Sequence, residues 1–155
     1  MSFTDWMLGL HLISAFAVAA ALVLFSILVY SGRRMTTLEQ TRTLFRVAPV
    51  GGLLITAGTG LVLLFGVILA VHSNRFNIWD GWVIAAIILF AAFGGVGQRS
   101  GAYYTEVQKL AEEQGGGNEA EVLARLKAST GATLHFATLA LFVLILLDMI
   151  YKPGA

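Results

Sequence analysis

The chain has 155 residues, of which 57% are hydrophobic and 12% are charged, and its mean hydropathy is +0.80. Soluble domains contain about 45–50% apolar and about 25% charged residues, so this composition excludes an ordinary soluble domain. The net charge of +1, without a basic arm, gives no sign of a nucleic-acid partner. The lack of cysteine excludes disulfides, thiolate metal sites and a cysteine nucleophile.

Four apolar runs are long enough to cross a bilayer as helices. They cover residues 6–30, 47–71, 78–97 and 132–151, and about 20 residues span a hydrocarbon core of about 30 Å. Backbone polar groups in lipid must bond internally, so runs of this length favour helices over barrel strands. Residues 1–155 are therefore expected to form a single membrane domain, an all-α bundle of four transmembrane helices.

Lysine and arginine are concentrated in two of the predicted loops. Eight of the ten basic residues lie in the first and third loops, at Arg33, Arg34, Arg42, Arg46, Arg99, Lys109, Arg125 and Lys127. The positive-inside rule places these loops in the cytoplasm and both termini outside. We therefore expect a multi-pass protein of the bacterial cytoplasmic membrane, with the lipid bilayer as its main partner and a homo-oligomer or a larger membrane complex as further partners.

The third loop has helical character. Tyr103, Val107 and Leu110 recur at helical spacing, and three glycines then interrupt the pattern. Asn118 has the position of an N-cap for a second helix. The third and fourth spans are thus expected to extend as a cytoplasmic helical hairpin over residues 100–128, which acts either as solvated linker helices or as a docking surface for a partner.

Ionisable side chains within the apolar runs are the candidate functional residues, because they are costly to place in a bilayer. At a rise of about 1.5 Å per residue, His11 lies about 7–8 Å inside the outer end of the first span. His72, Asp80 and Asp148 fall in the same outer half. His135 lies near the cytoplasmic end, about 15 Å from His11 along the membrane normal. A site shared by His11 and His135 is therefore disfavoured, and His11 with His72 is the easier pair.

Imidazole binds haem iron and copper, and carboxylates complete sites for hard metals. The pattern therefore predicts a cofactor, haem b or copper, held by His11, His72 or His135. A metal site in the outer half would use His11, His72, Asp80 and Asp148. The absence of any cofactor is an equal alternative, because Asp80 can cap a helix, Asp148 can pair with Lys152, and His135 can hydrogen-bond within the bundle.

Small residues form a stripe on the second apolar run. Gly52, Thr56 and Gly60 are spaced by four, and further glycines cluster at the end of the third run. Such stripes let helix backbones approach closely, so tight packing within the bundle is the expected role. A bound flat ligand or a homodimer contact is the alternative.

Three short stretches carry a resemblance to known families: residues 6–15 (WMLGLHLISA), 44–49 (LFRVAP) and 78–83 (IWDGWV). The first resembles the first helix of small bacterial membrane proteins of the CopD and HemJ group. Together the stretches resemble more closely a set of predicted bacterial integral membrane proteins of unknown function allied to that group. Similarity to CopD implies copper handling. Similarity to HemJ implies haem binding and protoporphyrinogen oxidation, with His11 as an axial ligand; the lysine that HemJ uses in its third helix has no counterpart in residues 78–97.

Three functions remain as alternatives. The first is a membrane protein that binds haem or copper in its outer half through His11, with a redox or copper-handling role. The second is a non-catalytic accessory or structural subunit of a membrane complex. The third is a permeation protein for protons or small solutes that uses His11, Asp80 and Asp148 as a relay. No GxSxG elbow, Walker loop or HExxH helix occurs, so the sequence assigns no reaction.

Overall fold

The computed structural model describes residues 2–72, 79–113 and 119–152. These residues form six helices: α1 (Phe3–Gly32), α2 (Leu38–Phe45), α3 (Ala48–His72), α4 (Gly81–Glu112), α5 (Glu119–Lys127) and α6 (Ser129–Tyr151). Within the described residues, α1, α3, α4 and α6 supply four segments that are long and apolar enough to cross a membrane. This confirms the predicted all-α membrane bundle.

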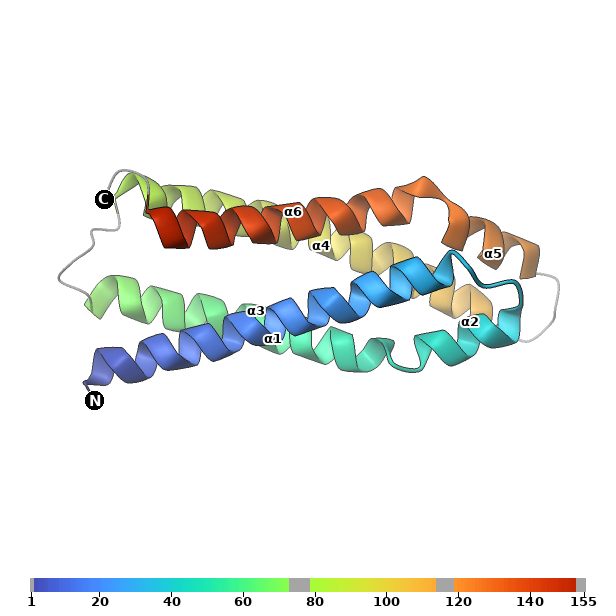
Figure 1. Ribbon diagram of the computed structural model, residues 1–155, viewed down its shortest axis with the longest axis horizontal. Coiled ribbons are helices and arrows are strands. Elements are labelled where there is room, and N and C mark those ends of the chain that lie inside the picture. The colour runs from blue at the N-terminus through green and yellow to red at the C-terminus, as the bar shows by residue number, and fades with distance from the viewer. Residues whose placement is uncertain (1, 73–78, 114–118, 153–155) are drawn as a thin grey trace.

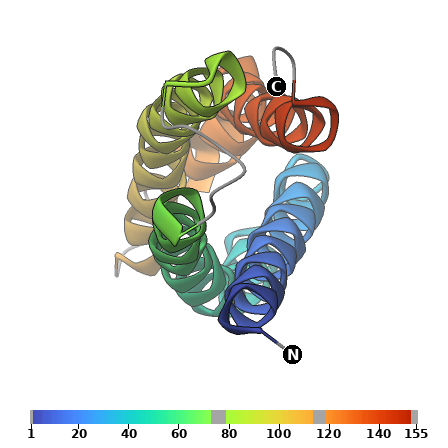
Figure 2. The same cartoon turned by 90° about the vertical axis from the view of Figure 1, so that its left-hand side faces the viewer.

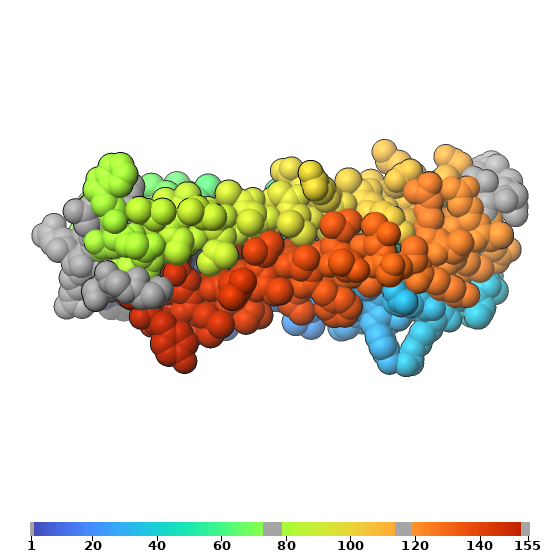
Figure 3. All heavy atoms as spheres, turned by 90° about the horizontal axis from the view of Figure 1, so that it is seen from above, coloured from blue at the N-terminus to red at the C-terminus, as the bar shows by residue number. Residues whose placement is uncertain are grey.

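The four long helices are arranged as two antiparallel pairs (Figures 1 and 2). α1 packs along α3 and α4 packs along α6, whereas α1 and α6 provide the main link between the long helices of the two pairs. Figure 3 shows α4 and α6 side by side along one face. The start of α1 and the end of α6 lie together at the terminal end, and α2 and α5 lie at the opposite loop end (Figure 1).

The outer surface of the bundle is apolar along much of its length. On α1, Ile13 is 66% exposed and Phe16 is 72% exposed, while Ser14 and Val18 are buried. Lipid tails solvate such apolar side chains, so only the inward stripe of each helix needs protein partners. The exposed surface therefore fits a bilayer environment.

Glycines let α1 and α3 approach closely, but they are Gly51 and Gly58 and not the predicted Gly52 and Gly60. A Cβ atom added to Gly58 would lie 2.9 Å from a methyl group of Val18, and one on Gly51 would lie 3.0 Å from the ring of Phe25. A Cβ atom on Gly52 or Gly60 would meet nothing within 4 Å. The tight-packing role predicted for the stripe of Gly52 and Gly60 is therefore wrong, because that stripe faces away from α1.

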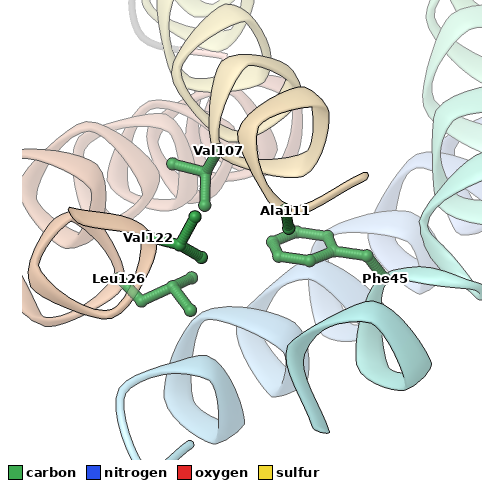
Figure 4. Close-up of a cluster of buried hydrophobic side chains, with 5 residues drawn as sticks. All are labelled: Phe45, Val107, Ala111, Val122 and Leu126. Atoms are coloured by element: carbon green, nitrogen blue, oxygen red, sulfur yellow. The ribbon is translucent and has the colours of Figure 1, made fainter. Parts of the chain in front are cut away.

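At the loop end, α4 continues without a break into the predicted hairpin and packs against α5. Five buried side chains hold this end together: Phe45, Val107, Ala111, Val122 and Leu126 (Figure 4). We call them the loop-end cluster. The hairpin is thus confirmed as two helices packed on one apolar core, whereas the predicted glycine break and the N-cap at Asn118 lie outside the described residues.

Polar contacts fix the helix ends around the loop-end cluster. The Arg42 guanidinium donates hydrogen bonds to the carbonyls of Ala111 and Glu113, at the end of α4. The hydroxyl of Tyr103 donates to the Arg125 carbonyl, at 2.8 Å, where α5 ends. Because the last carbonyls of a helix lack partners within it, Arg42 supplies donors that the end of α4 needs, and Tyr103 adds a second donor to the Arg125 carbonyl, which also accepts from the Ala128 N–H.

The short helix α2 was not predicted, although its start has a recognisable signal. The Thr37 side chain accepts a hydrogen bond from the backbone N–H of Gln40, at 3.3 Å. Threonine followed three residues later by glutamine is the spacing of a capping box. The first loop is therefore a structured connection, and it carries Phe45 into the loop-end cluster.

Candidate functional site

The outer residues predicted to gather do not share one place. The ring of His72 lies 5.1 Å from the ring of Phe3, centre to centre, at the terminal end. His11 instead faces Val62, which precedes His72 by about 15 Å along α3. The structure therefore does not bring His11 and His72 together.

The two predicted carboxylates occupy helix ends at the terminal end. Asp80 is the N-cap of α4, and its backbone carbonyl accepts from the N–H groups of Val83 and Ile84. Asp148 is only 8% exposed, and its Oδ2 has no hydrogen-bond partner among the described residues. The ion pair with Lys152 that the sequence allowed is not present between these two described residues; the Lys152 ammonium lies over the ring of Trp82, 5.5 Å from its centre. Across the described residues, no three histidine, aspartate or glutamate side chains gather as a metal site.

His11 is held in one orientation between α1 and α3. Its Nδ1 lies 3.0 Å from the Val62 carbonyl oxygen, which can only accept, so Nδ1 carries the proton and donates it. Gly66 leaves room for the ring, since a Cβ there would lie 3.2 Å from Cε1 of His11. In the neutral ring this leaves the lone pair on Nε2, which is the usual state of a histidine that ligates a metal.

His135 of α6 contacts Ser26 of α1, which lies about 22 Å from His11 along that helix. His135 and His11 are therefore far apart. His135 is 3% exposed, and its Nε2 is 2.8 Å from the Ser26 hydroxyl oxygen. The predicted hydrogen bond of His135 within the bundle is therefore confirmed. The neighbouring Thr138 does not take part and donates to the Leu134 carbonyl at 2.9 Å.

His135 lines a cavity of about 600 Å³ between the two helix pairs. α1 and α6 meet on one side of this space, whereas α3 and α4 scarcely contact each other, so the cavity opens between α3 and α4. We call it the α3/α4 cavity. Its aromatic side chains are Phe25, Phe45, Phe93 and Tyr104, and its polar side chains include Thr56, Thr59, Gln98, Ser100, Thr105, Gln108, His135 and Thr138.

Glycines from both facing helices form much of the wall. Gly52 and Gly60 of α3 and Gly94 and Gly101 of α4 all line the cavity, and a Cβ on any of them would meet nothing within 4 Å. Helix packing therefore does not explain these glycines. Their small size instead enlarges the cavity and leaves two flat walls of backbone.

The cavity has the character of a small-molecule site. Ligand sites are clefts of about 300–1,000 Å³, mostly apolar, with a few polar groups that orient the ligand. Here the apolar walls surround one buried histidine that is held in place by Ser26. The sequence pointed to the stripe of Gly52 and Gly60, and to His135, separately. Their meeting depends on how the helices are rotated about their axes, which residue spacing alone does not fix.

Comparisons with known proteins add no family to this description: the chain matches no protein-family model, no curated protein and no solved structure.

Proposed function

We propose that this protein is a multi-pass membrane protein that binds a lipid-soluble small molecule in the α3/α4 cavity. The observation that carries the proposal is that Gly52, Gly60, Gly94 and Gly101 face open space beside a nine-tenths buried histidine, His135. Small residues in membrane helices ordinarily allow close packing. Where they line a cavity instead, they make room for something other than the protein.

The position of the opening supports a ligand dissolved in lipid. The cavity opens sideways between α3 and α4, and both helices are long apolar segments that a bilayer would surround. A molecule in the hydrocarbon phase meets the opening directly.

The test uses naphthalene as an apolar probe, with the protein in lipid nanodiscs and empty nanodiscs subtracted. Methyl-labelled threonines report the site, because Thr56, Thr59 and Thr138 line the cavity. We expect NMR shifts at these methyl groups, abolished in Gly94→Leu, which fills the cavity. Gly95→Leu is the matched control, since Gly95 is exposed, lies outside the cavity lining and has nothing within 4 Å of a Cβ. Shifts that survive Gly94→Leu, or no saturable shifts at all, would contradict the proposal.

We further propose that the loop end faces the cytoplasm. Eight of the ten basic residues belong to the loops that lie there, and a positive excess marks cytoplasmic loops. The chain has no cysteine, so single cysteines can be introduced without background. In intact bacterial cells, a membrane-impermeant maleimide should label Thr4→Cys at the terminal end and leave Thr43→Cys of α2 unlabelled until the cells are lysed. The reverse pattern would invert the topology.

Haem ligation by His11 is a second candidate function. Its support is the bond from Nδ1 to the Val62 carbonyl, which leaves Nε2 as the atom able to ligate iron. A single imidazole fits one axial position of a haem, whereas a copper site would need further donors that do not gather around His11 in the described chain. Purified protein should then show a Soret band that His11→Ala removes and His72→Ala retains. Protein purified from haem-supplied cells without such a band would exclude this candidate.

A further inference from the structure

We propose that the α3/α4 cavity selects a ring that donates a hydroxyl hydrogen bond, a phenol or hydroquinone, over the corresponding quinone, because Ser26 leaves His135 only an acceptor atom to offer. The inference rests on the proposed binding function and names the chemistry of the ligand. It follows from the direction of two hydrogen bonds and from the shape of the cavity.

The direction of the first bond is set by a backbone carbonyl. The Ser26 hydroxyl lies 2.8 Å from the Leu22 carbonyl oxygen, which can only accept. Two oxygens at that distance without a hydrogen between them would repel, so the single hydroxyl proton of Ser26 points to Leu22. The Ser26 oxygen can then only accept from His135, and Nε2 of His135, at 2.8 Å, must be the donor.

The second nitrogen of His135 is therefore the acceptor. His135 has no ion pair among the described residues, and an unpaired buried charge is costly, so the ring is neutral with its one proton on Nε2. Within the described chain, Nδ1 has no hydrogen-bond partner. The His135 side chain lines the cavity, so a bound molecule that donates a hydrogen bond can pair with this acceptor.

The shape of the cavity favours a ring as the carrier of that donor. The glycine-lined walls of α3 and α4 are flat, and Phe25 and Phe93 supply aromatic surface beside them. A hydroquinone combines a flat apolar ring, solubility in lipid and a hydroxyl donor. The matching quinone has only carbonyl oxygens, which would oppose the lone pair on Nδ1. Gln98 and Gln108 can serve either form, so the discrimination rests on His135.

The experiment compares duroquinol with duroquinone, titrated anaerobically into the protein in nanodiscs and followed at the cavity threonine methyl groups. We expect duroquinol to bind about tenfold more tightly than duroquinone. The free-energy cost of leaving Nδ1 unpaired in the complex is about the free-energy difference that a tenfold change in Kd represents. In Ser26→Ala the Nε2 proton loses its acceptor, so His135 can carry its proton on Nδ1 instead. The preference should then fall to about twofold or less.

Ser14→Ala is the matched control, because Ser14 lies on the same helix and donates to the Leu10 carbonyl at 2.7 Å without contacting His135. It should keep the full preference. His135→Phe tests the same point independently of Ser26: it should keep a folded cavity that still binds naphthalene but no longer prefers the quinol.

Each outcome bears on one of the two proposals. Equal affinity of wild-type protein for quinol and quinone, with both blocked by Gly94→Leu, overturns the selection by His135 and leaves the binding function intact. A quinol preference that persists in Ser26→Ala and in His135→Phe also overturns it. If naphthalene binds but duroquinol and duroquinone do not, the proposed selection of a phenol or hydroquinone is overturned and the binding function remains. Failure of all three probes removes the binding function itself.

Discussion

Glycines on the two sides of α3 have opposite roles. On the side toward α1, side chains of α1 occupy the space beside Gly51 and Gly58. A Cβ atom added to these glycines would lie 3.0 and 2.9 Å, respectively, from the nearest atom of α1. On the side toward α4, Gly52 and Gly60 face open space. The comparison teaches that a small-residue stripe in a membrane helix does not by itself indicate packing, because its meaning depends on what stands opposite.

The largest expected effect comes from overfilling the closed side. In Gly58→Leu, the new side chain would collide with Val18 and with the Ser14 backbone, 3.2 Å from a Cβ, which cannot move aside. We expect little or no folded protein, judged by far-UV circular dichroism and gel filtration in detergent. Gly60→Leu should fold like the wild type. If both variants folded equally well, the two sides of α3 would not differ as described.

Loosening the loop end should come next, because this end holds the two helix pairs in register. Leu126 is 3% exposed and also fills the space beside Gly32, 3.2 Å from an added Cβ. Leu126→Ala should reduce the free energy of unfolding by about 2–3 kcal/mol through lost burial and a new void. Leu123→Ala, at a half-buried position of the same helix, should cost less than about 1 kcal/mol. Unfolding with sodium dodecyl sulfate, followed by circular dichroism, measures both, and equal losses would show that the cluster does not hold this end.

A milder substitution sharpens the comparison by giving opposite signs on the two sides. Alanine is favoured over glycine in a helix by about 1 kcal/mol, and Gly60→Ala meets no clash, so its stability should be unchanged or slightly raised. Gly58→Ala places a methyl group 2.9 Å from Val18 and should cost about 1–2 kcal/mol net. Thermal unfolding in detergent reports the sign of each change. A loss of stability in Gly60→Ala would mean that α3 and α4 pack more closely than the cavity implies.

The smallest effect is expected near His11, away from both sides of the comparison. Gly66→Ala would press its methyl group against Cε1 of His11, 3.2 Å away, and weaken the bond to the Val62 carbonyl. We expect a loss of less than about 1 kcal/mol, because the ring can shift by a few tenths of an ångström. Nitrogen-15 shifts of the His11 ring should move, while ligand binding in the α3/α4 cavity should not. A change in cavity binding would show that the two histidines are coupled.

Much of the fold could be predicted from the sequence, because the apolar runs are long enough to span a bilayer as helices. α3 begins within one residue of the predicted run, at Ala48, and α1 begins three residues early because Ser2 and Asp5 form a capping box. α2 was missed because a short amphipathic helix is weak beside such runs, although the spacing of Thr37 and Gln40 signals its start.

The candidate site was less accessible to sequence reasoning. The depth of His135 could be derived from helix rise, and this kept it apart from His11. Its partner Ser26 could not be found, because the rotation of α1 against α6 is set by packing and not by spacing along either chain. The same uncertainty of one residue step, about 100° around a helix, exchanged Gly52 for Gly51 in the packing prediction.

The sideways opening of the α3/α4 cavity changes what affinity means for this protein. A ligand that arrives between α3 and α4 is dissolved in a two-dimensional solvent, so its relevant concentration is its mole fraction among the lipids. A weak site, by the standards of aqueous titration, can then be filled whenever the compound accumulates in the bilayer. The occupancy of the cavity would then depend on the mole fraction of the ligand in the membrane around the protein.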